Sequence, residues 1–234
     1  MLATDPRYKY LMDIIMPNSC AVCGKVIVWD KLVCDECAAD MPDMFDGLIL
    51  AENTEGAVGV FYYEGAVIGL IYRSKHGGAV NNFAELCAEK LAERLRDRGI
   101  AENIDLVTAV PMHRRKRLAR GQNHAERAAR FVADKLSRPV DLSLLERSGD
   151  TTEQHKLEKE ERRSHAENVY KAAKHHSDIK GKTILICDDV ITTGSTISAC
   201  AERLKEMGAA KVYACSAAVS DVYRDSKDMD HIIP

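Results

Sequence analysis

The chain has 234 residues, of which 46% are hydrophobic and 29% charged, a composition that is ordinary for a globular protein and excludes a wholly disordered or collagen-like chain. Its formal net charge of -3 gives no overall attraction to nucleic acid or to an anionic membrane, so such contacts would need a local patch. No apolar run approaches the roughly 18 residues of a membrane span and the first residues lack a signal-peptide pattern, so we expect a cytoplasmic protein without membrane insertion.

Four of the eight cysteines form two C-x-x-C pairs near the N-terminus, separated by a short β-like stretch at residues 25–29. Such pairs supply the four thiolates of a structural tetrahedral Zn²⁺ site. Disulfides and an iron-sulfur cluster are the alternatives, but clustered pairs in a reducing cytosol favour a metal. Residues 1–45 hold too little apolar mass for their own core, so we expect a zinc module. Its predicted ligands are Cys20, Cys23, Cys34 and Cys37.

After this module, residues 57–63 predict a strand, and residues 66–72 carry apolar side chains at near-helical spacing. A long helix is predicted over residues 81–98. From residue 105 onward strands and helices alternate, which favours parallel strands with helical crossovers. The expected elements are strand 105–110, helix 122–136, strand 182–187, helix 195–207 and strand 211–219. The polar stretch at residues 150–173 is either a functional loop or a solvated insertion.

The segment at residues 184–196 begins with an apolar run, continues with Asp188 and Asp189, and ends in a glycine-containing hydroxyl cluster that opens a helix. In a parallel α/β sheet this position is the carboxyl edge, where ligands bind. The backbone N–H groups, hydroxyls and positive helix end suit a phosphate monoester, and the two carboxylates suit the 2′ and 3′ hydroxyls of ribose. The sequence therefore predicts a ribose 5-phosphate site. Its expected phosphate-binding residues are Val190, Thr192, Thr193, Gly194, Ser195 and Thr196.

Paired acids also follow apolar strands in Walker B elements and receiver domains, and a hydroxyl cluster can be a simple helix cap. A Walker A loop would place its glycine-rich segment after a strand. Here Gly181, Lys182 and Thr183 precede the strand, and His176 stands where the first glycine should be. The order of strand, acids, hydroxyl turn and helix therefore favours the ribose 5-phosphate interpretation.

At residues 184–196 the chain resembles the 5-phosphoribosyl 1-pyrophosphate signature of type I phosphoribosyltransferases, and with the N-terminal cysteines it resembles the ComF family of bacterial competence-associated proteins. Residues 110–113 and 120–123 resemble the family's V-P-x-x and R-G-F-N-Q motifs. Residues 147–168 resemble its R...T..Q..L....R..N stretch. The resemblance therefore covers most of the chain.

The resemblance implies a type I phosphoribosyltransferase-like α/β fold, a parallel sheet flanked by helices, over residues 46–234. Hood elements would occupy residues 46–100 and the core residues 101–234. The implied activity is transfer of the phosphoribosyl group from 5-phosphoribosyl 1-pyrophosphate to a nitrogen base, with Mg²⁺ bound to the pyrophosphate. The expected catalytic residues are Asp188, Asp189 and Arg162. The sequence identifies neither the acceptor base nor the oligomeric state.

The basic segment after the strand at 105–110 is the pyrophosphate loop of the resembled fold, where guanidinium, ammonium and backbone N–H groups bind pyrophosphate. A solvated charge run or a nucleic-acid patch is the alternative, and the position at the sheet edge of Asp188 favours pyrophosphate. Contact with single-stranded DNA stays open, although the aromatic residues that it would need are absent nearby. The expected pyrophosphate-binding residues are Met112, His113, Arg114, Lys116, Arg120 and Gly121.

Residues 150–168 resemble the flexible catalytic loop of such enzymes, from which Arg162 or Arg163 could reach the pyrophosphate. A salt-bridged exposed helix explains residues 158–163 about as well. The ComF resemblance also implies a second function, that of a non-catalytic accessory protein of DNA uptake. In that role the chain would bind single-stranded DNA or a competence helicase, and the pocket would sense a nucleotide.

Overall fold

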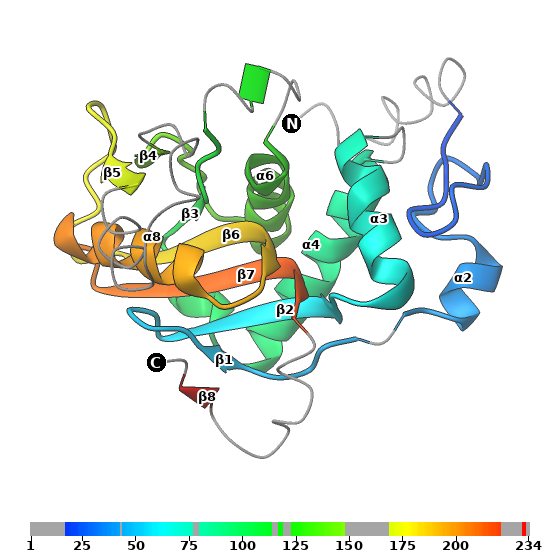
Figure 1. Ribbon diagram of the computed structural model, residues 1–234, viewed down its shortest axis with the longest axis horizontal. Helices are drawn as coiled ribbons and strands as arrows, with labels where there is room; N and C mark the ends of the chain where they lie inside the picture. The colour runs from blue at the N-terminus through cyan, green and yellow to red at the C-terminus, as the bar shows by residue number, and fades with distance from the viewer. Residues whose placement is uncertain are drawn as a thin grey trace, which may run out of the picture.

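A six-stranded sheet with helices on both faces forms the body of the molecule (Figure 1). The computed structural model describes residues 17–42, 44–76, 80–113, 117–118, 123–147, 169–220 and 231–232. Four neighbouring strands pair in parallel, and β1 runs antiparallel to β2 but parallel to β8. In sheet order the strands are β3 (Leu106–Ala109), β6 (Thr183–Ile191), β7 (Lys211–Val219), β2 (Gly56–Tyr62), β1 (Ile49–Leu50) and β8 (His231–Ile232).

The helices divide unequally between the two faces of the sheet. The helices are α2 (Asp35–Ala39), α3 (Gly65–His76), α4 (Val80–Asp97), the 3-10 helix η1 (Ala101–Asn103), α6 (His124–Leu136) and α8 (Ser195–Glu206). Three of them, α3, α4 and α6, cover one face, whereas α8 covers the other. A second, antiparallel sheet of β4 (Leu145–Arg147) and β5 (Tyr170–Ala172) lies against α8. The central strands are therefore covered on both sides.

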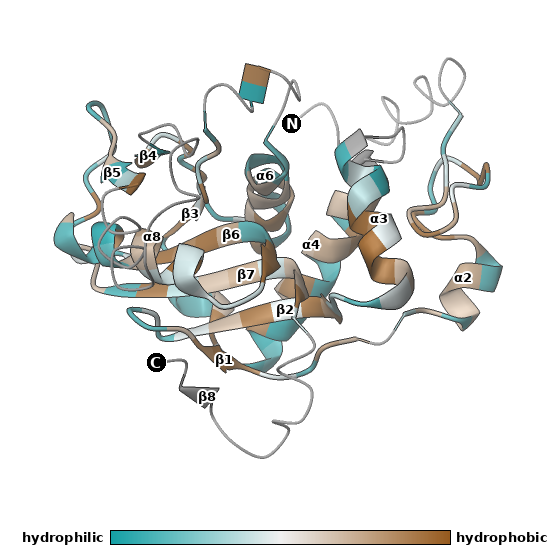
Figure 2. Cartoon of the chain, viewed as in Figure 1, coloured by the Kyte–Doolittle hydropathy of each residue, from teal (hydrophilic) through white to brown (hydrophobic). Residues whose placement is uncertain are grey.

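Alternating side chains along the central strands separate two hydrophobic cores. On β6, Leu185 and Cys187 belong to the core shared with α3, α4 and α6, whereas Ile184 and Ile186 belong to the core shared with α8. All four side chains are buried, as expected of a parallel strand with helices on both faces. Figure 2 shows hydrophobic residues on β2, β6 and β7 at the centre and hydrophilic residues on the outer turns of α8. Burial of these side chains fixes the register of β6 in the sheet. The register in turn fixes the position of the two aspartates near the carboxyl end of this strand.

The start of α6 is tied to the end of β3. The side chain of Asn123 caps the helix by accepting a hydrogen bond from the N–H of Ala125 at 3.1 Å. Its amide also donates to the carbonyl oxygen of Val110 at 3.0 Å. Ser137, with a left-handed φ of 54°, ends the same helix. The hydrogen bond between Asn123 and Val110 therefore holds the start of α6 next to the end of β3, at the carboxyl edge of the sheet.

The predicted α/β fold class, a parallel sheet flanked by helices, is confirmed. The predicted strand at residues 182–187 ends too early, because β6 continues to Ile191 and includes both aspartates. The expected β-like stretch at residues 25–29 is reduced to one isolated bridge between Ser19 and Val26. The strands β1, β4, β5 and β8 were not predicted, since each has only two or three residues.

The proposed hood segment also contributes to the central sheet, because β2 pairs with β7 along most of its length. Across the part of the chain that the structure describes, the helices are all too short or too polar to cross a membrane.

Candidate functional site

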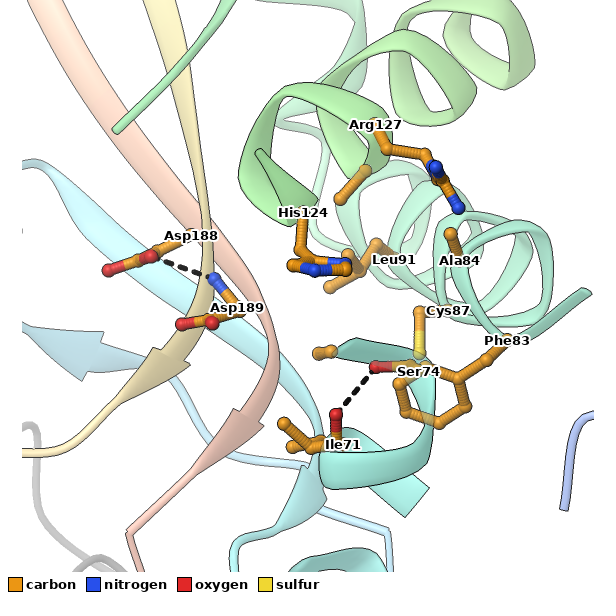
Figure 3. A pocket seen from close by; sticks show the side chains of 12 residues that line it. Ile71, Ser74, Phe83, Ala84, Cys87, Leu91, His124, Arg127, Asp188 and Asp189 are labelled. Atoms are coloured by element: carbon orange, nitrogen blue, oxygen red, sulfur yellow. Dashed lines mark hydrogen bonds between the residues drawn. The ribbon is translucent and has the colours of Figure 1, made fainter. Parts of the chain in front are cut away.

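Two adjacent carboxyl groups lie at the carboxyl end of β6. Asp188 accepts a hydrogen bond on Oδ1 from the backbone N–H of Asp189 at 2.8 Å, and both side chains are partly buried (Figure 3). Burial raises the pKa of Asp188 to about 8, and the negative charge of Asp189 adds to this increase. At neutral pH the Asp188 carboxyl group therefore keeps a proton for most of the time and can donate a hydrogen bond as well as accept one.

A lysine from the other half of the chain balances this pair. The ammonium group of Lys75, near the end of α3, forms an ion pair with Asp189. The side chains of Lys75 and Asp189 are 21% and 33% exposed, so solvent only partly screens the interaction. The positive charge also opposes the increase in the pKa of Asp188. Lys75 could not be identified as a site residue from the sequence, because a lysine shortly before a glycine pair is as typical of a helix end as of a ligand site.

A hydroxyl-rich turn follows directly. Gly194 adopts a left-handed conformation, with φ 75°, at the N-cap of α8, which a residue with a side chain would adopt only with strain. The hydroxyl oxygens of Thr193 and Ser195 are 3.0 Å apart and both side chains are exposed. The N-cap residue Gly194 provides no capping side chain, the N–H of Ser195 donates to the hydroxyl oxygen of Thr193 at 3.5 Å, and the first turn of the helix carries no acid. The turn thus combines the N–H groups of a helix start with hydroxyls, the donor set that binds a phosphate.

The start of the basic segment lies on the neighbouring strand. β3 pairs with β6 so that Ala109 faces Cys187, and the N–H of Val110 donates to the carbonyl oxygen of Cys187 at 2.9 Å. Met112 and His113 follow within a few residues of this pair and are partly buried. The sheet therefore brings the start of the predicted pyrophosphate loop beside the acid pair. The predicted residues Arg114, Lys116, Arg120 and Gly121 lie outside the described residues.

The small sheet of β4 and β5 brings a second group to the hydroxyl turn. The side chains of Tyr170 and Thr196 share a hydrogen bond, and burial raises the pKa of that tyrosine to about 12. The guanidinium carbon of Arg147 lies 5.6 Å from the centre of the Tyr170 ring, within the range of a cation–π contact. Arg147 and Tyr170 are also register partners. No motif in the sequence marks Tyr170 as a site residue, and the predicted catalytic residue Arg162 lies outside the described residues.

The four predicted metal ligands form one cluster. The sulfur atoms of Cys20, Cys23, Cys34 and Cys37 all lie within 4.8 Å of one another. Cys23 and Cys34 are 3.7 Å apart at sulfur, close to the edge of about 3.8 Å that a tetrahedron with Zn–S bonds of about 2.3 Å requires. None of the four forms a disulfide. The cluster can therefore hold a zinc ion.

Backbone N–H groups prepare one of these sulfurs as a thiolate. The sulfur of Cys20 accepts hydrogen bonds from the N–H groups of Val22 at 3.4 Å and Cys34 at 3.3 Å. Burial raises the pKa of Cys20, but these and other backbone hydrogen bonds outweigh it and lower the pKa to about 6. A thiolate is the form that binds metal. The donor set therefore fits zinc on chemical grounds as well as on geometry.

The cysteine cluster is attached to the helical face of the main fold. Ala21 belongs to the core formed by α3, α4 and α6. The guanidinium of Arg73 donates to the carbonyl oxygen of Val22 at 2.6 Å, and the amide of Asn82 donates to the carbonyl oxygen of Ser19 at 2.6 Å. Two helices thus hold the first knuckle on the side of the fold that carries Lys75.

Comparison with known protein families agrees with this arrangement. The family described as Phosphoribosyl transferase domain matches residues 122–232, which include the acid pair and the hydroxyl turn. This part of the chain is therefore similar to phosphoribosyltransferase domains.

Relatives over a longer part of the chain carry names from DNA metabolism. The chain is 26% identical over 200 residues to DNA utilization protein YhgH of Escherichia coli (strain K12), a match that covers 82% of this chain and 86% of that protein. It is 26% identical over 112 residues to Competence protein F of Haemophilus influenzae, covering 46% of this chain and 47% of that protein. These homologues confirm the resemblance to the ComF family that the motifs indicated.

A solved structure of related fold is the purine phosphoribosyltransferase from Pyrococcus horikoshii Ot3. The sequence identity is 21% and the TM-score 0.37, with 57% of this chain and 71% of that chain covered.

Proposed function

We propose that the protein binds 5-phosphoribosyl 1-pyrophosphate, or a related ribose 5-phosphate, and transfers the phosphoribosyl group to a nitrogen base. One observation carries the proposal. Asp188 and Asp189 lie near the carboxyl end of a buried parallel strand, and the turn that follows the strand opens α8 with hydroxyls and backbone N–H groups. A diol-binding pair and a phosphate-binding turn at this separation suit the two ends of a ribose 5-phosphate.

The turn would hold the 5-phosphate. Its exposed hydroxyls on Thr193 and Ser195 lie 3.0 Å apart at the start of α8, and Gly194 between them has no side chain to obstruct an anion. The hydrogen bond between Tyr170 and Thr196 would keep the last hydroxyl of the turn oriented. We assign phosphate binding to Val190, Thr192, Thr193, Gly194, Ser195 and Thr196.

The acids would hold the 2′ and 3′ hydroxyls of the ribose. Asp188 and Asp189 offer carboxyl oxygens, and the ion pair with Lys75 holds the Asp189 side chain in place. As the bond from the anomeric carbon to pyrophosphate breaks, positive charge develops on the sugar, and the nearby carboxylate stabilises it. The new bond forms from the base nitrogen to that carbon, and the nitrogen then loses its proton.

The segment after β3 would bind the leaving pyrophosphate through Met112, His113, Arg114, Lys116, Arg120 and Gly121. We assign Arg162 a catalytic role at the same leaving group. Mg²⁺, bound together with the substrate, would neutralise part of the charge of pyrophosphate. The described start of the segment, beside Cys187 on β6, supports this assignment because it puts the loop at the edge that carries the acids.

The zinc module would be structural. Four cysteine ligands complete the coordination of Zn²⁺ and leave no open position for a substrate. We propose a zinc module at residues 1–45 and a phosphoribosyltransferase-like domain at residues 46–234.

A second candidate function is that of a non-catalytic accessory of DNA uptake, in the cytoplasm, which would bind single-stranded DNA or a competence helicase. The names of the homologues, DNA utilization protein and Competence protein F, favour it. In this case the ribose phosphate pocket would bind a nucleotide as a signal.

The first experiment measures binding of 5-phosphoribosyl 1-pyrophosphate with Mg²⁺ by calorimetry. Asp188→Asn combined with Asp189→Asn should weaken binding at least about a hundredfold, because the pair loses its carboxyl groups and the negative charge that faces Lys75, while circular dichroism shows an intact fold. Asp134→Asn, on the exposed face of α6, is the matched control. Unchanged affinity of the double variant would refute the assigned roles.

A companion assay separates the two candidate functions. Release of pyrophosphate in the presence of a panel of bases would support transfer. Binding to single strands that weakens steeply with salt, without any pyrophosphate release, would support the DNA-uptake function instead.

A further inference from the structure

A pocket borders the acid pair on the face of the sheet that α3, α4 and α6 cover (Figure 3). It contains about 450 Å³ of empty space, part of which is open to solvent. The opening to solvent gives a small molecule access to the pocket. Asp188 and Asp189 form one side of the pocket, so a molecule inside it would lie next to a ribose bound to these acids.

Most of the pocket wall consists of carbon. Phe83 and Leu91 of α4 contribute large side chains, whereas Ala84, Ala128 and Ala217 contribute only methyl groups. Phe83 is held in place, because its ring stacks on that of Phe61 with 6.4 Å between ring centres. These small side chains leave part of the space between the helices and the sheet unfilled. The walls therefore favour an aromatic molecule over a sugar or a chain of polar groups.

Besides the two aspartates, the pocket is lined by an arginine, which carries a positive charge. Arg127 of α6 lines it, and in the view of Figure 3 the imidazole of His124 lies between this arginine and the acids. Arg127 is partly buried, and burial lowers its pKa. Within the described ranges no carboxylate forms an ion pair with it. Arg117, by contrast, pairs with Glu126.

A guanidinium that has lost water but gained no carboxylate partner favours an anionic ligand group. A ligand that reaches from the acids to Arg127 would have its uncharged end near the sugar and its anionic end at the arginine. This polarity distinguishes the pocket from one that would bind a neutral ring.

We propose that this pocket holds the acceptor of the phosphoribosyl group, a flat ring that carries an anionic substituent such as a carboxylate and places that substituent on Arg127. The inference rests on the proposed function, because it makes the pocket the acceptor half of the same site. It names the class of the acceptor: a small heteroaromatic acid, with a nitrogen at the end of the ring that faces Asp188 and Asp189.

Benzoate and benzamide test the class of ligand. They share one ring and differ in charge, and benzoate lacks the ring nitrogen that would let it react. Calorimetry measures the affinity of each for the protein alone and for the protein saturated with 5-phosphoribosyl 1-pyrophosphate and Mg²⁺. Benzoate should bind about tenfold tighter than benzamide or better, because only benzoate can form a charged hydrogen bond to Arg127.

Three variants of the pocket refine the test. Arg127→Gln should weaken benzoate binding about tenfold and remove the preference over benzamide, whereas Arg127→Lys should retain a preference for the anion. Arg130→Gln, on the exposed surface of α6, is the matched control and should change neither affinity. Ala84→Leu should fill the pocket and exclude both probes while the affinity for 5-phosphoribosyl 1-pyrophosphate stays within about twofold of the original.

The outcomes separate this inference from the proposed function. If 5-phosphoribosyl 1-pyrophosphate binds and the two probes bind equally or not at all, the acceptor inference is wrong and the proposed function stands. If 5-phosphoribosyl 1-pyrophosphate fails to bind, the proposed function is wrong, and a preference for benzoate that depends on Arg127 would still support the ligand class of the pocket.

Discussion

The cysteine cluster takes its four ligands from residues 20–37, whereas the acid pair and the hydroxyl turn depend on elements that are far apart in the chain. The cysteines need only two knuckles and a metal ion to hold their geometry. Asp189, by contrast, meets Lys75 from α3, and Thr196 meets Tyr170 from the small sheet. The metal site is formed by neighbouring residues, whereas the acid pair and hydroxyl turn are assembled by the fold. A substitution in one site should therefore have little effect on the other.

The largest expected effect concerns the local site. Cys23→Ser removes one of four zinc ligands and should reduce the zinc content of the purified protein from near one ion per chain to a small fraction of that. Hydrogen exchange should then become fast across residues 17–42, because the module has little core of its own. Metal analysis and exchange mass spectrometry provide the measurement.

Asp40→Asn, exposed beside the same cluster, is the control and should keep its zinc. In both variants the affinity for 5-phosphoribosyl 1-pyrophosphate should remain within about threefold, since the ribose site has its own supports. Full zinc content in Cys23→Ser would contradict the assignment of the ligands.

An intermediate effect concerns the assembled site and pH. The folded chain raises the pKa of Asp188 to about 8, so the native state binds this proton more tightly than the unfolded state does. The stability that this proton contributes is present at low pH and is lost progressively as pH rises from about 4 to about 8. Asp188→Asn carries no such charge, so its stability relative to the original protein should increase over that range.

Denaturant unfolding at several pH values measures the difference. Asp134→Asn, exposed on α6, should give a curve parallel to that of the original protein. Parallel curves for Asp188→Asn as well would show that burial does not raise the pKa of this carboxyl group.

The smallest expected effect concerns a single support of the hydroxyl turn. Tyr170→Phe removes the hydrogen bond to Thr196 and keeps the ring under Arg147. The affinity for 5-phosphoribosyl 1-pyrophosphate should fall about three- to tenfold, as expected for the loss of one neutral hydrogen bond. Tyr213→Phe, near the start of β7 and so at the amino edge of the sheet, should leave this affinity unchanged. A loss larger than that of the double aspartate variant would mean that Tyr170 contacts the substrate itself.

The contrast between a local and an assembled site also explains what the sequence could predict. The spacing of the cysteines identified all four members of the cluster, because their positions depend on a few neighbouring residues. The order of apolar run, acids and hydroxyls likewise located β6 and the start of α8. Lys75 and Arg127 could not be assigned in this way, because a lysine or arginine on a helix looks the same whether it faces solvent or a pocket.

Element ends were predicted less well than element types, and β6 shows why. The apolar run stops at Cys187, but the strand continues to Ile191 because pairing with β7 extends that far. Backbone pairing across strands leaves no mark on the residues themselves.

The sheet order has a consequence for any attempt to study the segment that matches the family in isolation. The segment that matches the phosphoribosyltransferase family, residues 122–232, supplies β6 and β7 but neither β3 nor β2, the strands that flank them. A fragment cut to this segment would expose unpaired backbone along both sides of its central strands, a surface that recruits other chains. The N-terminal half of the polypeptide therefore completes the sheet around the segment that matches the family. The protein should be studied as one folding unit from β2 onward.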